Sequence, residues 1–384
     1  MERVKMKIGK TLLECLEIVE DPRADYNRRH NFLDIMAIAI LSVISGADTW
    51  DDMENWGHAK KEWLESFLEL PNGIPSHDTF NRVFSMIKPE QFHKAFTEWV
   101  EAVMGKIEGV VAIDGKTVRR SMDGSSGKRA IHVVSAWAVE SGIVLGQCRT
   151  EEKSNEITAI PELLKQLELK GCIVTMDAMG TQTKIAETII SREADYILQV
   201  KENQPRLYED ISLYFKGEAE LAGKKTIAEK GCYYKEYSGE HGRIEEREYY
   251  VEHDIEWMEE KKDWKGIQGI GMCHTKVEKG GETTESYSYA IFSKKGMSAE
   301  EFGKGKRNHW KIENSLHWVL DIAYREDESR ARKGNSAENL NILRQMTLNM
   351  LKQEKTCKRG IAGKRKICGW DNEYLLKVLN SADA

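Results

Sequence analysis

Two aspartates in the chain stand directly after apolar runs that have the character of buried strands. Asp114 follows VVAI and precedes Gly115, and Asp177 follows IVTM and precedes Ala178. In open α/β sheets, functional side chains gather beyond the carboxyl ends of the strands. A single aspartate in such a place is commonly only a turn former. If the two strands are neighbours, both carboxylates converge on one site.

Two converging carboxylates without nearby Cys, in a site open to substrate, suit a hard divalent cation. Mg²⁺ and Mn²⁺ take oxygen ligands and retain water molecules that a phosphate-bearing substrate can replace. A pair of such ions can activate an attacking oxygen and stabilise the leaving oxygen of a phosphodiester. This chemistry calls for a third carboxylate.

Glu313 is the candidate for that third carboxylate. It lies in HWKIENSLHWVLD, residues 309–321, whose apolar spacing predicts a helix. The apolar stripe of this helix consists of Ile312, Leu316, Val319, Leu320 and Ala323. Glu313 lies roughly 80° from the centre of the stripe, so it can reach a site while the helix stays packed.

Two other interpretations of this helix remain open. His309 and His317 lie four residues on either side of Glu313, so the three side chains could act as zinc ligands on one face. The two histidines are, however, about 12 Å apart along the helix, and the chain lacks an H-E-x-x-H motif. The helix could also be an ordinary amphipathic one whose His and Trp side chains only pack.

The elements that must position these acids form an α/β pattern. The predicted order from about residue 109 is three strands, a helix, a strand, a second helix and a further strand, at VVAIDGKTV, HVVSAWAV, IVLGQCRT, ITAIPELLKQLEL, CIVTMDAMG, TQTKIAETIISREA and DYILQVK. This order predicts a mixed sheet with an antiparallel edge. Residues 1–105 have helical spacing, and residues 205–295 alternate in the manner of a β-rich insertion.

The composition is that of a soluble globular protein. The chain has 384 residues, of which 40% are hydrophobic and 31% charged, and its net charge of −6 argues against a simple nucleic-acid coat. Basic residues nevertheless cluster in 116–129 and 352–366, so a basic face on an acidic protein is open, as is a merely solvated surface.

Several features favour a cytoplasmic protein. The longest apolar run, residues 33–45, is too short to span a bilayer and contains Asp34. The N-terminus lacks the apolar core of a secretion signal. Seven cysteines without a C-x-x-C pair are typical of a reducing compartment.

Long ordered motifs give the chain a family resemblance. AIDGKTVRRS, TMDAMGTQ, YILQVKENQP and the stretch from RNHWKIENSLHW to RARKGNSAENL together resemble bacterial insertion-sequence transposases of the H-repeat-associated type of Rhs elements. The helical N-terminal part resembles the domain attached to them, so the resemblance runs from about residue 15 to about residue 351. Many wider relatives place a Tyr, an Arg and a Lys where this chain has Lys306, His309 and Leu320.

The resemblance implies a DDE transposase with a ribonuclease H-like catalytic domain. Asp114, Asp177 and Glu313 match its three acids and would hold two Mg²⁺ or Mn²⁺ ions. The implied partners are double-stranded DNA with terminal inverted repeats and target DNA, in the nucleoid of a bacterial cytoplasm, with a homodimer assembled on the DNA. The expected DNA contacts are Lys116, Arg119 and Lys201 at phosphates and His309, His317 and Trp318 along the cleaved strand.

The expected organisation has three parts. They are an N-terminal helical domain at 1–105 with possible DNA binding, a catalytic domain at 106–351 that carries the insertion at 205–295, and a basic C-terminal tail at 352–384. Two other functions stay open, namely a catalytically inactive DNA-binding relic and a stand-alone metal-dependent nuclease.

Overall fold

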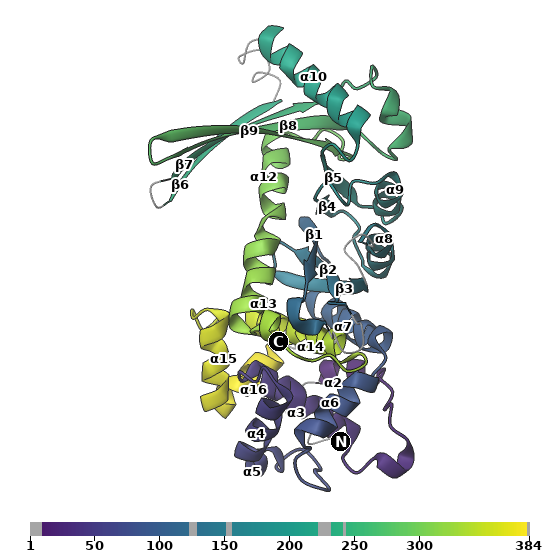
Figure 1. Ribbon diagram of the computed structural model, residues 1–384, viewed down its shortest axis with the longest axis vertical. Coiled ribbons are helices and arrows are strands. Elements are labelled where there is room, and N and C mark those ends of the chain that lie inside the picture. Colours follow the sequence, from purple (N-terminus) through teal and green to yellow (C-terminus); the bar gives the residue numbers. More distant parts are fainter. Residues whose placement is uncertain (1–9, 123–128, 151–155, 222–231, 241–242, 382–384) are drawn as a thin grey trace.

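The computed structural model describes residues 10–122, 129–150, 156–221, 232–240 and 243–381 (Figure 1). Its centre is a nine-stranded sheet in the order β3-β2-β1-β4-β5-β9-β8-β7-β6. The strands are β1 (Val110–Thr117), β2 (His132–Ala138), β3 (Ile143–Thr150), β4 (Ile173–Met176), β5 (Asp195–Val200), β6 (Tyr233–Glu240), β7 (Arg243–Glu252), β8 (Gly269–Lys279) and β9 (Glu282–Phe292). Strands β1, β4 and β5 are parallel and the other neighbours antiparallel, so the prediction of a mixed sheet is confirmed.

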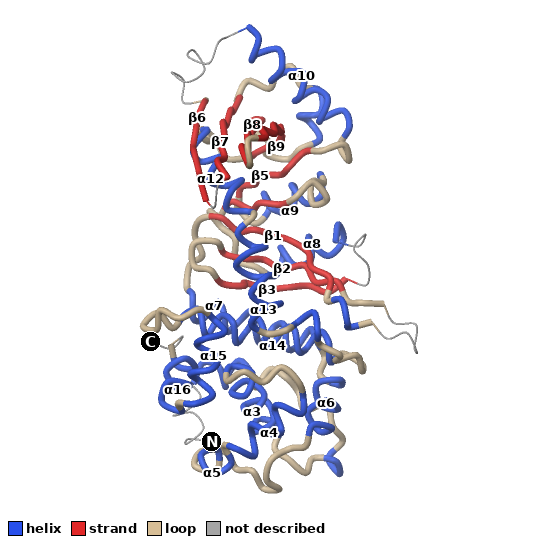
Figure 2. Tube along the Cα trace, turned by 60° about the vertical axis from the view of Figure 1, so that its left-hand side comes forward, coloured by secondary structure: helices blue, strands red, loops and turns tan. Residues whose placement is uncertain are grey.

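Helices cover both faces and one edge of this sheet. They are α2 (Lys10–Leu16), α3 (Phe32–Ile44), α4 (Trp50–Ala59), α5 (Lys61–Leu64), α6 (His77–Met86), α7 (Pro89–Met104), α8 (Glu156–Gln166), α9 (Thr183–Ser191), α10 (Pro205–Leu221), α12 (Ala299–His309), α13 (Trp318–Ala323), α14 (Ser336–Gln353), α15 (Ile361–Trp370) and α16 (Asn372–Asn380). Helices α8 and α9 pack on one side, α12 crosses the other, and α7 and α14 cover the β3 edge (Figures 1 and 2). No helix in the described ranges is long and apolar enough to cross a membrane.

The insertion differs from the largely β expectation because it begins with a helix. Helix α10 buries Leu207, Ile211 and Phe215, which recur every four residues and line one helix face. The four strands that follow then join the main sheet, because β9 pairs with β5 through Ile197 and Phe292. Their outer ends project from the body of the molecule (Figure 1).

The C-terminal segment, expected to be a basic tail, contains two packed helices. Helices α15 and α16 contact α14 and α3. The buried Lys364 donates to the carbonyl of Leu351 at 2.9 Å, and the buried Arg365 donates to that of Val43 at 3.0 Å. Two of the basic residues in this cluster therefore hold the helices in place.

Candidate active site

The two aspartates directly follow the parallel pairing of two neighbouring strands. The parallel pairing of β1 with β4 ends where Ile113 lies opposite Met176, and Asp114 and Asp177 are each the next residue. Strand β4 stops there, whereas β1 continues to Thr117 in its pairing with β2. We call the two places where this parallel pairing ends the β1 end and the β4 end. Adjacent strands are about 4.8 Å apart. The sequence predicts that the two acids converge if their strands are neighbours, and β1 and β4 are neighbours in the sheet.

Asp114 meets two side chains from the far end of the chain. One carboxylate oxygen of Asp114, one of Glu313 and a ring nitrogen of His317 all lie within 4.8 Å of one another. Glu313 is exposed, whereas His317 is buried. Of the three residues in the zinc interpretation, Glu313 and His317 belong to this group, but its third member is Asp114 and not His309.

The segment that carries Glu313 is not a regular α-helix. Residues Glu313–His317 form a π-helical turn between α12 and α13. Its hydrogen bonds close over five residues instead of four, and such turns are frequent at functional sites. The predicted stripe still holds its core, because Ile312, Leu316 and Leu320 are buried.

Lysines satisfy two carbonyl groups of this π-helical turn. The ammonium of Lys352 donates to the carbonyl of Ser315 at 2.8 Å, and that of Lys116 donates to the carbonyl of His317 at 3.4 Å. A turn that departs from the α-helical pattern needs such outside partners for its backbone groups. The lysines thereby stabilise the turn in which Glu313 and His317 face Asp114.

His317 controls the electrostatics of Asp114. Burial raises the pKa of the Asp114 carboxyl, but His317 and, more weakly, His309 outweigh burial and hold that pKa below its ordinary value. Nε2 of His317 lies 3.2 Å from Oδ2 of Asp114. The same Nε2 is buried without a well-aligned hydrogen bond, so its bonding capacity is not met.

His309 is buried and is influenced by the charges of both aspartates. Its Nδ1 is 3.3 Å from Oγ1 of Thr175 on β4. Burial lowers the pKa of His309, while Asp114 and Asp177 each raise it. The ring is therefore buried beside β4, within electrostatic reach of both aspartates.

Asp177 is engaged in its own turn. Its Oδ1 accepts from the backbone N–H groups of Met179 at 3.0 Å and Gly180 at 3.3 Å. This is the turn-former geometry that sequence analysis weighed for a single aspartate. Within the described residues, Asp177 is not part of the tight group around Asp114.

Asp177 instead lines a cavity of about 690 Å³. Lys201, the residue after β5, lies on its wall together with Tyr208 and Tyr287. Nearby, Lys306 donates to Oγ of Ser288 at 2.8 Å, and burial together with Lys201 lowers the pKa of Lys306 to about 8. Sequence analysis missed the two tyrosines, whose only signal was the aromatic content of the insertion.

Lys116 does not have the surroundings of a free phosphate ligand. Its side chain is 14% exposed, and its ammonium contacts Asp321 and lies 2.8 Å from Glu326. Burial lowers the pKa of Lys116, but Glu326 and Asp321 outweigh burial and raise it. Lys116 therefore joins β1 to the chain that follows Glu313.

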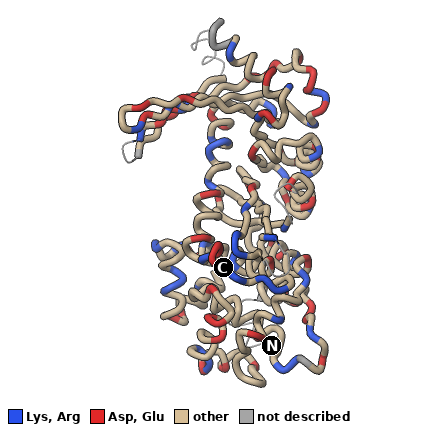
Figure 3. Tube along the Cα trace, in the orientation of Figure 1, with Lys and Arg blue, Asp and Glu red and all other residues tan. Residues whose placement is uncertain are grey.

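The remaining predicted contacts lie at the surface. The Arg119 side chain is 81% exposed and its Nε lies 3.3 Å from Asp327. Trp318 is 59% exposed. Close to Arg119, both basic and acidic side chains, among them Arg120 and Asp51, line a cavity of about 750 Å³ near the start of α4. Acidic and basic residues are likewise mixed along the projecting strands β6 to β9 (Figure 3).

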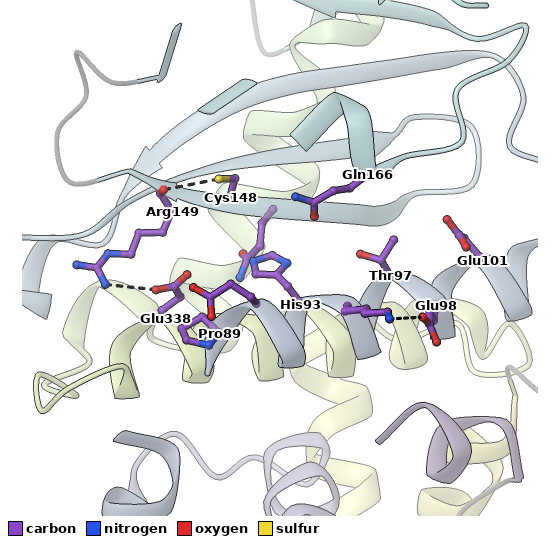
Figure 4. Close-up of a pocket in the computed structure, with 12 residues that line it drawn as sticks. Pro89, His93, Thr97, Glu98, Glu101, Cys148, Arg149, Gln166 and Glu338 are labelled. Atoms are coloured by element: carbon purple, nitrogen blue, oxygen red, sulfur yellow. Dashed lines mark hydrogen bonds and ion pairs between the residues drawn. The ribbon is translucent and has the colours of Figure 1, made fainter. Parts of the chain in front are cut away.

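Another cavity, of about 560 Å³, lies between α7 and β3 (Figure 4). Burial lowers the pKa of His93 on its wall to about 4, and Arg149 and Glu338 form an ion pair at 3.3 Å beside it. None of Asp114, Asp177 and Glu313 lines this cavity. It is therefore separate from the acid cluster.

Comparison with known proteins identifies close relatives of the chain. Residues 105–350 match the family described as "Transposase DDE domain", and residues 13–100 match "DDE_Tnp_1-associated". The chain is 40% identical over 376 residues to "Putative transposase YncI" of Escherichia coli O157:H7, which covers 97% of this chain and 95% of that protein. It is 38% identical over 377 residues to "H repeat-associated putative transposase YhhI" of Escherichia coli K12, with 96% and 98% covered.

Two further similarities say little about the candidate site. A short stretch of 79 residues, 21% of this chain and 94% of the other, is 39% identical to "Inactive transposase YbfQ" of Escherichia coli K12. Among solved structures, the piggyBac transposase synaptic complex with hairpin DNA matches with a TM-score of 0.45 and 8% identity, over 98% of this chain and 79% of that one. A likeness this remote carries no argument about the site.

Proposed function

The chain belongs to the family of DDE transposases, and from this premise we propose that it cuts DNA at terminal inverted repeats and joins the freed ends to target DNA. In the first step, water is added across a phosphodiester and frees a 3′-hydroxyl. In the second, that hydroxyl attacks a phosphodiester of the target and displaces a 3′-hydroxyl of the target strand, so that one phosphodiester replaces another. The single observation that carries the proposal is the meeting of Asp114 with Glu313, across about half of the chain, beside a second strand-end acid at Asp177.

The donor atoms fit the divalent ions that such chemistry needs. We assign Asp114, Asp177 and Glu313 as the residues that hold two Mg²⁺ or Mn²⁺ ions, which favour carboxylate oxygen. When bound, the ions supply a Lewis acid to the attacking and the leaving oxygen. The unmet Nε2 of His317 beside Asp114 supports this fit, because a buried polar atom without a partner is rare.

Residues around the acids suit a DNA strand. Lys201 at the cavity beside Asp177 and the exposed Arg119 are placed to meet phosphate oxygens. Trp318, exposed one residue after the π-helical turn, offers a face on which a base can stack. The poorly exposed Lys116, His309 and His317 lie beside acidic side chains instead, which differs from the DNA contacts expected from sequence.

We extend the proposal to the organisation of the chain. Residues 106–351 form a ribonuclease H-like catalytic domain, in which three antiparallel strands precede two parallel ones and the 205–295 insertion adds four more. Residues 1–105 form a helical domain with which DNA ends can associate, and 352–384 support it from the C-terminal side. The active form is a homodimer on paired DNA ends in the nucleoid of the bacterial cytoplasm.

The test is an assay on DNA that carries the inverted repeats flanking the coding region. With Mg²⁺, the wild-type protein is expected to produce 3′-hydroxyl ends and products joined to a target plasmid. Asp114→Asn and Glu313→Gln should lose both products, whereas Glu62→Gln, at an exposed acid on α5, should keep them.

Each alternative function gives a different result in this assay. Cutting without any joined product would identify a stand-alone nuclease. Specific binding of the repeats without cutting would identify an inactive relic, the condition that the name of one short relative describes. Wild-type levels of cutting by Asp114→Asn and Glu313→Gln would rule out the three-acid mechanism.

A further inference from the structure

The cluster around Asp114 contains a nitrogen donor as well as carboxylates. A ring nitrogen of His317 and one oxygen each of Asp114 and Glu313 lie within 4.8 Å of one another, and Nε2 of His317 is 3.2 Å from Oδ2 of Asp114. Ligands on opposite sides of one ion, bonded at about 2.1 Å, are separated by about 4.2 Å. Small side-chain rotations would therefore let all three atoms bind a single ion.

The position of the imidazole is fixed before any ion binds. The His317 side chain is 4% exposed and belongs to the π-helical turn. In this turn Lys352 donates a hydrogen bond to the carbonyl of Ser315, and Lys116 donates one to the carbonyl of His317. Glu313, at the start of the same turn, is exposed. A buried, fixed nitrogen next to a solvent-accessible carboxylate is the arrangement of a metal site that stays open to substrate.

A simple ion pair does not account fully for His317. Its Nε2 is 3.2 Å from Oδ2 of Asp114, yet this contact lacks the alignment of a hydrogen bond. His309, by contrast, has a polar neighbour outside the acids, at Oγ1 of Thr175. Of the two histidines, His317 is thus the one whose free nitrogen faces two carboxylates.

We propose that His317 is itself a metal ligand, so that Asp114, Glu313 and His317 form a mixed nitrogen and oxygen site that prefers Mn²⁺ to Mg²⁺. This inference rests on the proposed function, since it concerns one of the two ions in the same site. Imidazole binds Mn²⁺ and later first-row ions more readily than Mg²⁺, which takes oxygen ligands. Asp177, outside this tight group in the described chain, would serve the other ion with oxygen donors.

The experiment is pulsed electron paramagnetic resonance on the full-length protein loaded with Mn²⁺. A directly bound imidazole adds a ¹⁴N modulation to the Mn²⁺ echo. We expect this modulation in the wild type, its loss in His317→Gln, and its retention in His309→Gln, the matched control at the other buried histidine. Mn²⁺ affinity should fall about 10–100-fold in His317→Gln, as is common when support for a metal site is removed.

The possible results separate this inference from the proposed function. Bound Mn²⁺ without ¹⁴N modulation in the wild type would overturn the role of His317 and leave a three-carboxylate site intact. Modulation that persists in His317→Gln but disappears in His309→Gln would also overturn it. If His317→Gln does not fold, the wild-type spectrum alone decides. Failure of the wild type to bind Mn²⁺ at all would count against the metal chemistry as a whole.

Discussion

The ends of β1 and β4 share a sequence pattern but differ in their surroundings. At each, the parallel pairing of the two strands stops at a buried residue that precedes an aspartate and a small residue, although β1 itself continues to Thr117. At the end of β1, Asp114 is enclosed by Glu313 and His317. At the end of β4, Asp177 turns back on its own loop and borders an open cavity of about 690 Å³.

This difference indicates a division of labour within one site. The β1 end is preorganised, with buried partners that fix the donors in place. The β4 end has room and an exposed cation at Lys201, which suits an incoming phosphate. We infer that the first end holds an ion before DNA arrives and that the second is completed by the DNA.

The largest expected effect separates the two aspartates. Asp114→Asn should reduce cutting by roughly 10⁴-fold, as loss of a central catalytic group does in other enzymes, and should also remove metal binding in the absence of DNA. Asp177→Asn should reduce cutting comparably but leave metal binding without DNA nearly unchanged. Isothermal titration with Mn²⁺, alongside the cutting assay, checks both. Equal losses of metal binding in the two variants would abolish the distinction.

The next effect contrasts two lysines near the two strand ends. Lys116→Met removes the ion-pair partner of the buried Glu326 and should lower the free energy of unfolding by about 3–5 kcal/mol. Lys201→Met, at an exposed residue, should change it by no more than about 0.5 kcal/mol. Urea denaturation measures both values. A stable Lys116→Met protein would show that this network does not fix the β1 end.

A smaller effect is expected at the residues that follow the two aspartates. A Cβ at Gly115 would clash with Nε2 of His132 and lie 2.6 Å from Oε1 of Glu156, and these two side chains are buried and hydrogen-bonded to each other. Gly115→Ala should therefore cost about 1–3 kcal/mol of stability. Ala178→Gly, at the equivalent place after Asp177, should cost about 0.5–1 kcal/mol. Thermal unfolding measures the stability of both variants. An unchanged stability of Gly115→Ala would contradict the expected difference.

The smallest effect concerns DNA affinity at the open end. If Lys201 meets one phosphate, Lys201→Ala should lower the slope of log affinity against log salt by about 1. Lys201→Arg keeps the charge and should preserve the slope. Fluorescence anisotropy on repeat DNA between low and moderate salt measures it. An unchanged slope in Lys201→Ala would place the DNA elsewhere.

Sequence analysis predicted the parts of the fold that depend on local pattern. The order of strands and helices from β1 to β5 and the apolar core around Ile312, Leu316 and Leu320 follow from periodicity, and the structure confirms both. Glu313 was placed on the flank of that stripe, and it is exposed there. Periodicity is a local property, so one sequence suffices to predict it.

What the sequence could not predict depends on distant contacts. The π-helical turn at Glu313–His317 has an ordinary helical pattern, and its carbonyl partners Lys116 and Lys352 come from elsewhere in the chain. The burial of Lys116 likewise depends on Asp321 and Glu326. A lysine that contacts DNA and a lysine that pairs with a buried carboxylate look the same in a sequence, so only the fold distinguishes these two roles.

The central claim is that the three acids hold a pair of ions in which the β1 end provides the first position. Anomalous diffraction from crystals of the protein with Mn²⁺ and cleaved repeat DNA tests it most directly. We expect two peaks about 4 Å apart, one bonded to Asp114, Glu313 and His317 and the other sharing Asp177, and only the first peak when DNA is absent. Mn²⁺ peaks remote from Asp114, with or without DNA, would contradict the account.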